Sequence, residues 1–246
     1  MKRIAFISVF IAIPLGFLGC SQSIHAQALS EAKTPIVLEL FTSQSCSSCP
    51  PADKLLGQLA EENENIIALS CHVTYWNHLH WKDTLSKDFC TKRQRQYVQS
   101  LNSRGPYTPQ IVVNGHREMV GSRGGSVRRA IAADLKQPSI KPIELGLEGN
   151  HLNINLPSIA EASTYQLLLI SHGDAHHQSI PSGENRGRTI TYTNPVQNII
   201  SLGMWDGRPK NLDYDLSNTP KTTGYVVLAQ KNGSAGKIVA AAQIKP

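Results

Sequence analysis

The strongest constraint on the fold is a pair of cysteines placed between an apolar strand and a helix. The run PIVLELFT at residues 35–42 is continuously apolar and rich in β-forming residues, which predicts a strand covered on both faces. Residues 51–62 then carry apolar side chains at helical spacing. Cys46 and Cys49 lie between these two elements, so an α/β fold is expected, with the cysteines where the strand gives way to the helix.

The start of that helix gives Cys46 a favourable electrostatic position. With Ser48 as N-cap, Pro50 and Pro51 take positions N2 and N3, where an amide hydrogen would be unpaired in any helix. Free backbone N–H groups and the positive end of the helix dipole favour a thiolate over a thiol. Cys46 is therefore expected to be the nucleophile of the pair.

The N-terminus, residues 1–28, has the pattern of an export signal. MKR precedes an apolar run that is too short, and interrupted by Pro14, to span a bilayer. Ala26 and Ala28 fit a secretory cleavage site, whereas the segment ending at Cys20 loosely resembles a lipobox in which Cys20 is lipidated. Both alternatives predict a periplasmic or secreted protein, and the second would anchor it to a membrane.

Four cysteines remain after export, an even number in a compartment where disulfides persist. A bond between Cys46 and Cys49 closes almost no loop, so this pair is better explained by reversible chemistry than by stability. A bond between Cys71 and Cys90 would stabilise the fold by about 3 kcal/mol. Buried free cysteines are common, so the pairing of Cys71 with Cys90 stays open.

Three uses of the Cys46–Cys49 pair are compatible with the residues. One is thiol–disulfide exchange, in which Cys46 attacks a partner disulfide and Cys49 resolves the mixed disulfide. Another is ligation of copper or zinc with help from His72, His78 and His80. The last is an inert disulfide. Exchange is the favoured interpretation, because no second Cys-X-X-Cys motif completes a metal shell.

The rest of the first predicted domain, residues 33–137, alternates strands and helices. The patterns predict a strand at residues 65–73, a helix at 88–101, a hairpin turning at Asn114-Gly115 and a helix at 123–136. Parallel pairing of the first two strands would put their C-terminal ends on one edge. That edge would bring four residues near the cysteines, namely His72, Tyr75, Trp76 and Trp81.

A linker at residues 138–142 precedes a second predicted domain, residues 143–246, whose pattern has a period of two. Strands are expected at residues 143–147, 152–156, 164–171, 188–193, 223–230 and 237–244. The fold class is thus a mixed sheet flanked by helices, followed by a mostly antiparallel β domain. Glu184, Asn185 and Arg188 are expected to organise a strand connection in this domain.

Five segments in order, ELFTSQSCSSCPPAD, HVTYWNHLHWKD, RQRQY, YTPQIVVNG and GENRGR, resemble the secreted bacterial thioredoxin-like family called domain of unknown function 1223. The resemblance covers almost the whole mature chain, and it implies a thioredoxin-like fold for the first domain. It further implies that Pro109 is a cis-proline beside the cysteine pair, and that the Thr108 backbone can pair with an extended substrate. Tyr107, Trp76 and His72 are further residues expected to contact that substrate, unless the aromatic ones serve only as core packing.

These observations predict an exported thiol–disulfide oxidoreductase that acts on protein or small-molecule thiols and disulfides. It would need no cofactor beyond its own cysteines. The alternative is a metal-binding or non-catalytic binding module on the same scaffold. A nucleic-acid partner is not expected, because the net charge of +6 is scattered and no basic stripe is interleaved with aromatic residues.

Overall fold

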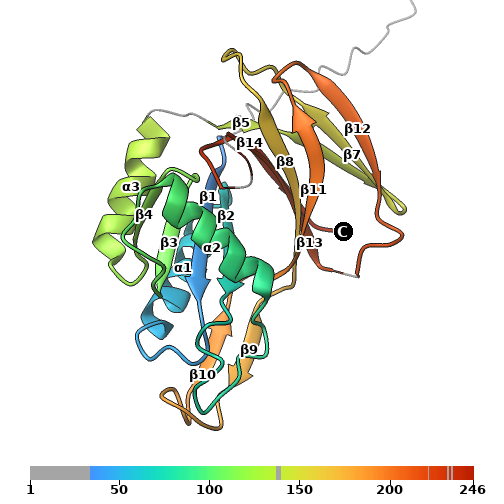
Figure 1. Cartoon of the computed structure of the whole chain (residues 1–246). Coiled ribbons are helices and arrows are strands. Elements are labelled where there is room, and N and C mark those ends of the chain that lie inside the picture. Colours follow the sequence, from blue (N-terminus) through green and yellow to red (C-terminus); the bar gives the residue numbers. More distant parts are fainter. Residues whose placement is uncertain (1–33, 137–139, 221, 232, 234) are drawn as a thin grey trace, which may run out of the picture. The chain divides into compact units, whose positions relative to one another are not determined.

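The computed structural model describes residues 34–136, 140–220, 222–231, 233 and 235–246, so the predicted signal segment and Cys20 lie outside the described residues. The first part of the chain has the predicted order of elements, with each predicted helix or strand boundary correct to within one residue (Figure 1). These elements are β1 (Ile36–Thr42), α1 (Pro50–Glu62), β2 (Ile66–His72), α2 (Asp88–Ser100), β3 (Gln110–Val113), β4 (Arg117–Val120) and α3 (Gly124–Lys136).

The first sheet is four-stranded and mixed, with the order β2-β1-β3-β4. β1 pairs in parallel with β2, from Ile36 opposite Ile66 to Thr42 opposite His72, and antiparallel with β3. Every residue of β1 is buried, as its continuous apolar run predicts. The parallel pairing brings the C-terminal ends of β1 and β2 to one edge of the sheet.

The two faces of this sheet are covered by different parts of the chain. On one face, Leu40 of β1 shares an apolar cluster with Leu56 of α1 and Ile131 of α3. The cluster on the other face joins β1 and α2 to strands of the second part, through residues that include Phe41, Tyr97, Leu168 and Val226. The two parts of the chain therefore share this second cluster, which is called the shared core below.

The second part is almost entirely β. Its strands are β5 (Lys141–Pro142), β6 (Glu144–Glu148), β7 (His151–Leu156), β8 (Tyr165–His172), β9 (His176–Ser179), β10 (Thr189–Tyr192), β11 (Val196–Trp205), β12 (Lys210–Asp215), β13 (Gly224–Lys231) and β14 (Ile238–Ile244). They form sheets with the orders β11-β8-β13-β14-β5, β12-β7-β6 and β10-β9. The pairings are antiparallel except for β14 with β5. The chain is a mixed α/β protein with several sheets.

Several parts of this architecture differ from the sequence-based expectation. Lys141 and Pro142, which the pattern places in a linker, form β5 beside β14. β9 is polar throughout, and two register shifts interrupt the alternation of β11, so neither has the regular apolar period of a predicted strand. β12 is a further strand outside the expectation, although Leu212 and Tyr214 alternate with polar residues and pack against the core of the second part.

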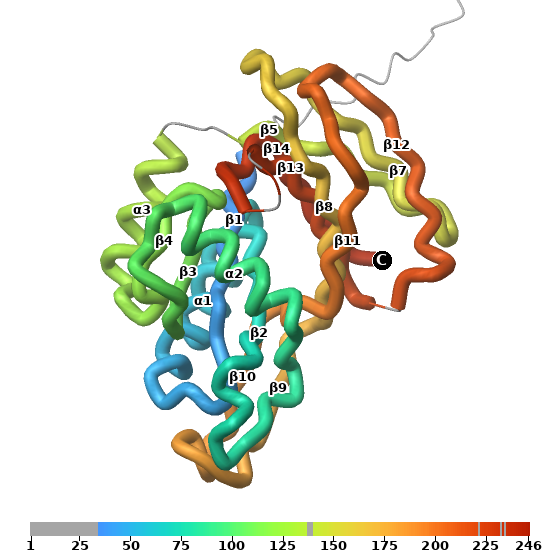
Figure 2. The backbone as a smooth tube through the Cα atoms, in the orientation of Figure 1, coloured from blue at the N-terminus to red at the C-terminus, as the bar shows by residue number. Residues whose placement is uncertain are grey.

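The β9–β10 hairpin leaves the second part and runs beside the outer strand of the first sheet (Figure 2). Ser70 of β2 forms a parallel bridge with Pro195, and its amide donates to the Asn194 carbonyl at 3.3 Å. The Asn194 side chain donates to the carbonyl of Ala68 at 2.9 Å. These contacts carry the hairpin to the edge where β1 and β2 end. None of the helices in the described part of the chain is long and apolar enough to cross a membrane.

Candidate functional site

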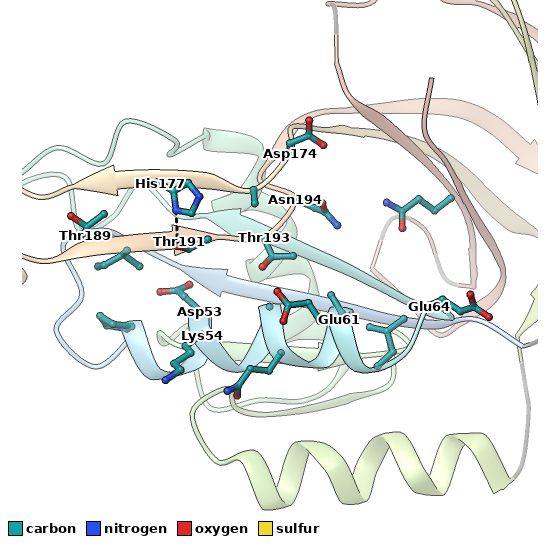
Figure 3. Close-up of a pocket in the computed structure, with 18 of the residues that line it drawn as sticks. Asp53, Lys54, Glu61, Glu64, Asp174, His177, Thr189, Thr191, Thr193 and Asn194 are labelled. Atoms are coloured by element: carbon teal, nitrogen blue, oxygen red, sulfur yellow. Dashed lines mark hydrogen bonds between the residues drawn. The ribbon is translucent and has the colours of Figure 1, made fainter.

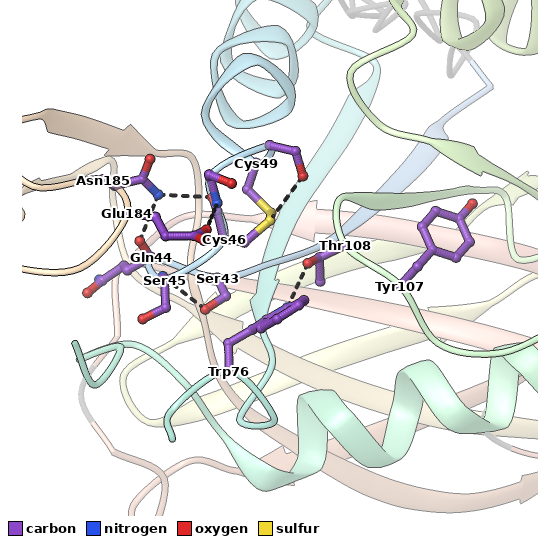
Figure 4. The surroundings of a disulfide bond; sticks show 12 residues. Ser43, Gln44, Ser45, Cys46, Cys49, Trp76, Tyr107, Thr108, Glu184 and Asn185 are labelled. Atoms are coloured by element: carbon purple, nitrogen blue, oxygen red, sulfur yellow. Dashed lines mark hydrogen bonds between the residues drawn. A yellow bond between two sulfur atoms is a disulfide. The ribbon is translucent and has the colours of Figure 1, made fainter. Parts of the chain in front are cut away.

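Cys46 and Cys49 form a disulfide in the turn between β1 and α1, with their Cα atoms 5.4 Å apart (Figure 4). The Cys46 amide donates to the carbonyl of Ser43 at 3.1 Å, and the Cys49 amide donates to the carbonyl of Cys46 at 3.2 Å. Cys46 is 4% exposed and Cys49 is fully buried. The pair thus has an outer and an inner sulfur, and the outer one is the expected nucleophile.

The N-cap of this helix lies one residue later than predicted. Cys49 is the N-cap of α1, and Pro50 and Pro51 take the first two helical positions. The Ser48 hydroxyl lies 3.4 Å from the Cys46 sulfur and makes no capping bond to the helix. Both prolines lack an amide hydrogen, so this helix start offers few backbone donors to Cys46. The amides of Ser47 and Ser48, which precede the prolines, are the remaining candidates.

The Thr108–Pro109 peptide bond is cis, as the family resemblance implies. Thr108 lies beside the disulfide in Figure 4, where its hydroxyl accepts a hydrogen bond from the Trp76 indole at 2.8 Å. Tyr107 points away, and its hydroxyl donates to Glu118 of β4. Of the residues expected to contact substrate, Thr108 and Trp76 therefore adjoin the cysteines, whereas Tyr107 does not.

The aromatic residues after β2 have two different surroundings. Tyr75 and Trp76 are half-buried and pack against the shared core, with their ring centroids 5.7 Å apart. Trp81 packs against the β9–β10 hairpin, and its indole donates to the side-chain oxygen of Gln44 at 2.8 Å. Packing thus accounts for Tyr75 and Trp81, while Trp76 combines packing with a place at the site.

His72, also expected to contact substrate, is instead buried against Asp83. Its Nδ1 lies 2.8 Å from Asp83, and neither side chain is exposed. Asp83 also accepts bonds from the amides of Gln44 and Leu85 at 2.8 Å. Burial alone would raise the pKa of Asp83, but His72 and the two amides outweigh it and hold that pKa below its ordinary value. Asp83 therefore ties the Cys46 turn to β2.

Further polar groups are buried behind Cys49. Asp53 lies one helical turn after Cys49, and neither of its carboxyl oxygens has a hydrogen-bond partner within the described chain. Burial raises the pKa of Asp53 to about 7, although the nearby His72 opposes the shift. The ring of Tyr192 of β10 packs edge-on against the His72 ring, with the ring centroids 4.5 Å apart, and burial raises the pKa of Tyr192. An acid that titrates near neutral pH thus adjoins the inner cysteine.

The residues proposed as metal ligands are not brought together. His72 is committed to Asp83, whereas His78 and His80 are exposed on the loop, where His78 Nδ1 lies 2.8 Å from the Tyr75 carbonyl. Within the described ranges, no group of three or more histidine, cysteine or acidic side chains is arranged to hold an ion.

The Cys46 turn is also held by the loop between β9 and β10, a contact that sequence reasoning missed. Asn185 donates to the carbonyls of Gln44 and Cys46, both at 2.9 Å, and the Glu184 carboxylate accepts from the Ser47 amide at 3.3 Å (Figure 4). These residues lie almost 140 positions apart in the sequence. No local pattern signals such a contact, and the turn role expected for Glu184 and Asn185 does not include it.

Cys71 of β2 and Cys90 of α2 form a second disulfide, with their Cα atoms 5.3 Å apart. The sequence spacing left this pairing open. Both residues are buried in the shared core, on the face of the sheet that α2 covers. This disulfide joins two elements of the scaffold.

A cavity of about 1300 Å³ lies between α1 and the β9–β10 hairpin (Figure 3). Its walls carry charges of both signs, and neither cysteine lines it. Asp53 forms part of its wall, and the other charged or titratable residues that line it include Lys54, Glu61, Asp174, His177 and Lys245. The cavity is therefore separate from the disulfide.

The sequence matches the family described as protein of unknown function DUF1223 over residues 37–230, and the chain belongs to this family. A crystal structure of a protein from Agrobacterium tumefaciens is similar over 85% of this chain and 93% of its own, with 29% identity and a TM-score of 0.75. HBP35 of Porphyromonas gingivalis is similar over 87% of this chain and 75% of its own, with 15% identity and a TM-score of 0.55, which indicates a likeness of fold alone. No curated protein matches the sequence.

Proposed function

We propose that this chain is an exported thiol–disulfide oxidoreductase that works through Cys46 and Cys49. The observation that carries the proposal is the placement of the pair. The disulfide lies at the start of α1, directly after a buried central strand and beside a cis Thr108–Pro109 bond. A Cys-X-X-Cys pair at a helix N-terminus is the arrangement in which one sulfur is ionised readily and the other can displace it.

The proposed scaffold is thioredoxin-like. The order β-α-β, helix, β-hairpin and helix supports this proposal, together with the sheet order β2-β1-β3-β4. So do the helices on both faces of the sheet, α1 and α3 on one and α2 on the other. The second part, in this proposal, is an additional β-rich unit whose hairpin completes the surroundings of the dithiol.

In the proposed reaction, the Cys46 thiolate attacks one sulfur of a partner disulfide. A mixed disulfide forms, the partner's S–S bond breaks, and the electron pair leaves with the partner's other sulfur as a thiolate. Cys49 then loses its proton and attacks Cys46, which releases the second partner thiolate and regenerates the Cys46–Cys49 disulfide. Two electrons pass to the partner, and the reverse sequence oxidises a partner dithiol.

Asp53 is the proposed acceptor of the Cys49 proton. Residues four apart on a helix face the same side, about 5–6 Å apart at Cβ. Both groups are buried, and neither Asp53 oxygen has a partner in hydrogen-bond geometry within the described chain, although the nearby Thr42 hydroxyl opposes the rise of its pKa. A carboxyl with a pKa of about 7 can take and return a proton at neutral pH.

The burial of Cys46 restricts the proposed partners. At 4% exposure, Cys46 presents little of its surface to a partner. A small disulfide, or an extended peptide lying along Thr108, can approach such a sulfur more readily than a disulfide buried in a folded protein. The proposed substrates are therefore small-molecule disulfides and disulfides in exposed, extended segments.

Export to the periplasm or the medium is proposed on the evidence of the two disulfides, because such bonds persist in oxidising compartments. Attachment through a lipidated Cys20 is the alternative form of this proposal.

The function is tested with the purified full chain, reduced and then mixed with glutathione disulfide or with an extended peptide that contains one disulfide. We expect the wild type to reduce the probe, Cys46→Ala to be inactive, and Cys49→Ala to accumulate a mixed disulfide on Cys46 that dithiothreitol releases. A Cys71→Ala/Cys90→Ala double variant, which keeps the Cys46–Cys49 pair, is the matched control and should retain exchange. The proposal is overturned if the wild type reduces neither probe, or if Cys46→Ala is as active as the wild type.

A further inference from the structure

The loop between β9 and β10 contacts the Cys46 turn through two adjacent side chains, although it belongs to the other part of the chain. Its neighbours hold it in place there. The Ser182 hydroxyl donates to the His80 carbonyl at 2.8 Å, and Trp81 packs in one cluster with Ile180 and Ile190 on either side of the loop. The contact between this loop and the Cys46 turn is thus a built part of the fold.

Asn185 is suited to fix the backbone around Cys46. It is fully buried, and its amide group donates to the carbonyls of Gln44 and Cys46, both at 2.9 Å. Its oxygen accepts from Arg188 at 3.1 Å. Only a side-chain amide supplies two such donors and an acceptor from one short side chain. An alanine here would leave both buried carbonyls without this partner.

Glu184 acts on the same turn through charge. Its carboxylate accepts from the Ser47 amide at 3.3 Å, on the exposed rim of the site. Because Pro50 and Pro51 supply no amide hydrogens, the backbone donors of this turn come from the residues before them, and the Ser47 N–H follows directly after Cys46 in the chain. A carboxylate that occupies this donor adds negative charge beside the position where the thiolate forms, and both effects disfavour the thiolate.

Other charged groups surround the turn on the elements packed against it. The buried ones are His72, whose Nδ1 lies 2.8 Å from Asp83, and Asp53, which lies behind Cys49. Those on the exposed segments around the site are Lys54, His78, His80, Lys82, Arg186 and Arg188. Glu184 is the acidic side chain with a hydrogen bond to the Cys46–Cys49 turn on its exposed side, so its removal should produce a separable effect.

We propose that Glu184 and Asn185 are positioning residues of the dithiol: Asn185 anchors the β9–β10 loop to the Cys46 turn, and Glu184, held there, keeps the Cys46 sulfur less ionised than the helix start alone would make it. The inference rests on the proposed exchange function and adds to it a means by which the second part of the chain sets the reactivity of the first.

The test measures the rate of Cys46 alkylation by iodoacetamide against pH, in the reduced full chain, with the modified peptide quantified by mass spectrometry. Glu184→Gln removes the charge but keeps an acceptor for Ser47, whereas Glu184→Ala removes both. We expect the midpoint of the pH profile to fall by roughly 0.3 to 1 pH unit in Glu184→Gln, because one partly screened negative charge is lost. The midpoint should fall further in Glu184→Ala, because the hydrogen bond that occupies the Ser47 amide is lost as well. Glu61→Gln, an exposed change near the far end of α1, should leave the midpoint unchanged.

Asn185→Ala separates anchoring from a general loss of stability. If Asn185 holds Glu184 in place, Asn185→Ala should lower the midpoint in the same direction, and Glu184→Ala should add little to it in the double variant. A purely structural Asn185 would lower the melting temperature and leave the midpoint where it is. That result would overturn the anchoring role, and an unchanged midpoint in both Glu184 variants would overturn the role of the charge.

The two proposals fail in different ways. A wild-type Cys46 that alkylates readily but exchanges with neither disulfide probe contradicts the proposed function and leaves the alkylation midpoints to decide the role of Glu184. A wild type that exchanges, with identical midpoints in all variants, contradicts only the inference about the loop.

Discussion

At the scale of single residues, Asp53 is the most unusual side chain of this molecule. A carboxyl group buried without a hydrogen-bond partner is costly in its charged form, and proteins usually avoid it. Here both oxygens lack a partner within the described residues, and the group lies one turn after the inner cysteine. The cost is therefore expected to appear in the stability of the protein as a function of pH.

The free energy of unfolding should fall as pH rises from about 4 to about 7. The pKa of Asp53 is 3.8 in the unfolded chain and about 7 in the folded one, so the native state binds more protons between these values. At ~1.4 kcal/mol per pKa unit, the loss reaches about 4 kcal/mol above pH 7. Asp53→Asn removes this titration, so the oxidised variant should gain stability relative to wild type at pH 8 but not at pH 4 in urea unfolding.

Glu61→Gln, an exposed carboxylate of the same helix, serves as the comparison and should show the same small difference from wild type at both pH values. An Asp53→Asn effect of equal size at pH 4 and pH 8 would contradict the assignment of a raised pKa to this group.

The sequence identifies the residues of the site that lie on the first sheet and its loops. Cys46 and Cys49 are found by their motif, and His72 and Trp76 by the shared strand edge. Asp53 is missed because it reads as an ordinary polar residue in the first turn of a helix. Asn185 is missed because its contacts join residues almost 140 positions apart, which no local pattern encodes.

At the scale of elements, prediction succeeds where one apolar pattern dominates. β1 is buried on both faces and is therefore a continuous apolar run, whereas α1 is buried on one face and carries its apolar side chains at helical spacing. β9 lacks such a pattern because all its residues are polar, and β12 offers only Leu212 and Tyr214 between polar residues, which is too short a signal to predict a strand. The Asn114-Gly115 turn is predictable for a different reason, since both residues have the positive φ angles that this residue pair adopts readily.

The disulfide between β2 and α2 should contribute to stability and not to exchange. It closes a loop with a sequence separation of 19, for which the chain-entropy estimate is about 3 kcal/mol. We expect the Cys71→Ala/Cys90→Ala variant to lose about that free energy of unfolding in urea under non-reducing conditions. Retention of the wild-type unfolding midpoint would show that this bond does not brace the fold.

At the scale of the whole molecule, a buried polar cluster joins the two parts of the chain. Glu39 of β1 forms an ion pair with Arg93 of α2, and both are 2–3% exposed. Tyr97 donates to Glu39 at 2.5 Å. Arg93 also donates to Gln230 of β13 at 2.9 Å, and Gln230 in turn donates to the Tyr97 hydroxyl at 2.9 Å. An ion pair and several hydrogen bonds thus join the two parts of the chain inside the shared core, in addition to its apolar contacts.

Removing one member of the buried ion pair should cost more than removing both. Arg93→Met leaves the Glu39 charge without its guanidinium, and we expect a loss of about 3–5 kcal/mol in the free energy of unfolding. The Glu39→Gln/Arg93→Met double variant carries no buried charge and should recover at least half of that loss. Denaturant unfolding at pH 7 measures both, and a double variant as unstable as the single one would contradict this reasoning.

The core that β1 and α2 share with β8 and β13 also bears on the modularity of this protein. An excised segment 34–136 would expose Val37, Phe41 and Tyr97 to water. Another β unit could replace the second part only if it offered an apolar surface complementary to these side chains. The two parts are therefore expected to be inherited together and to change in concert.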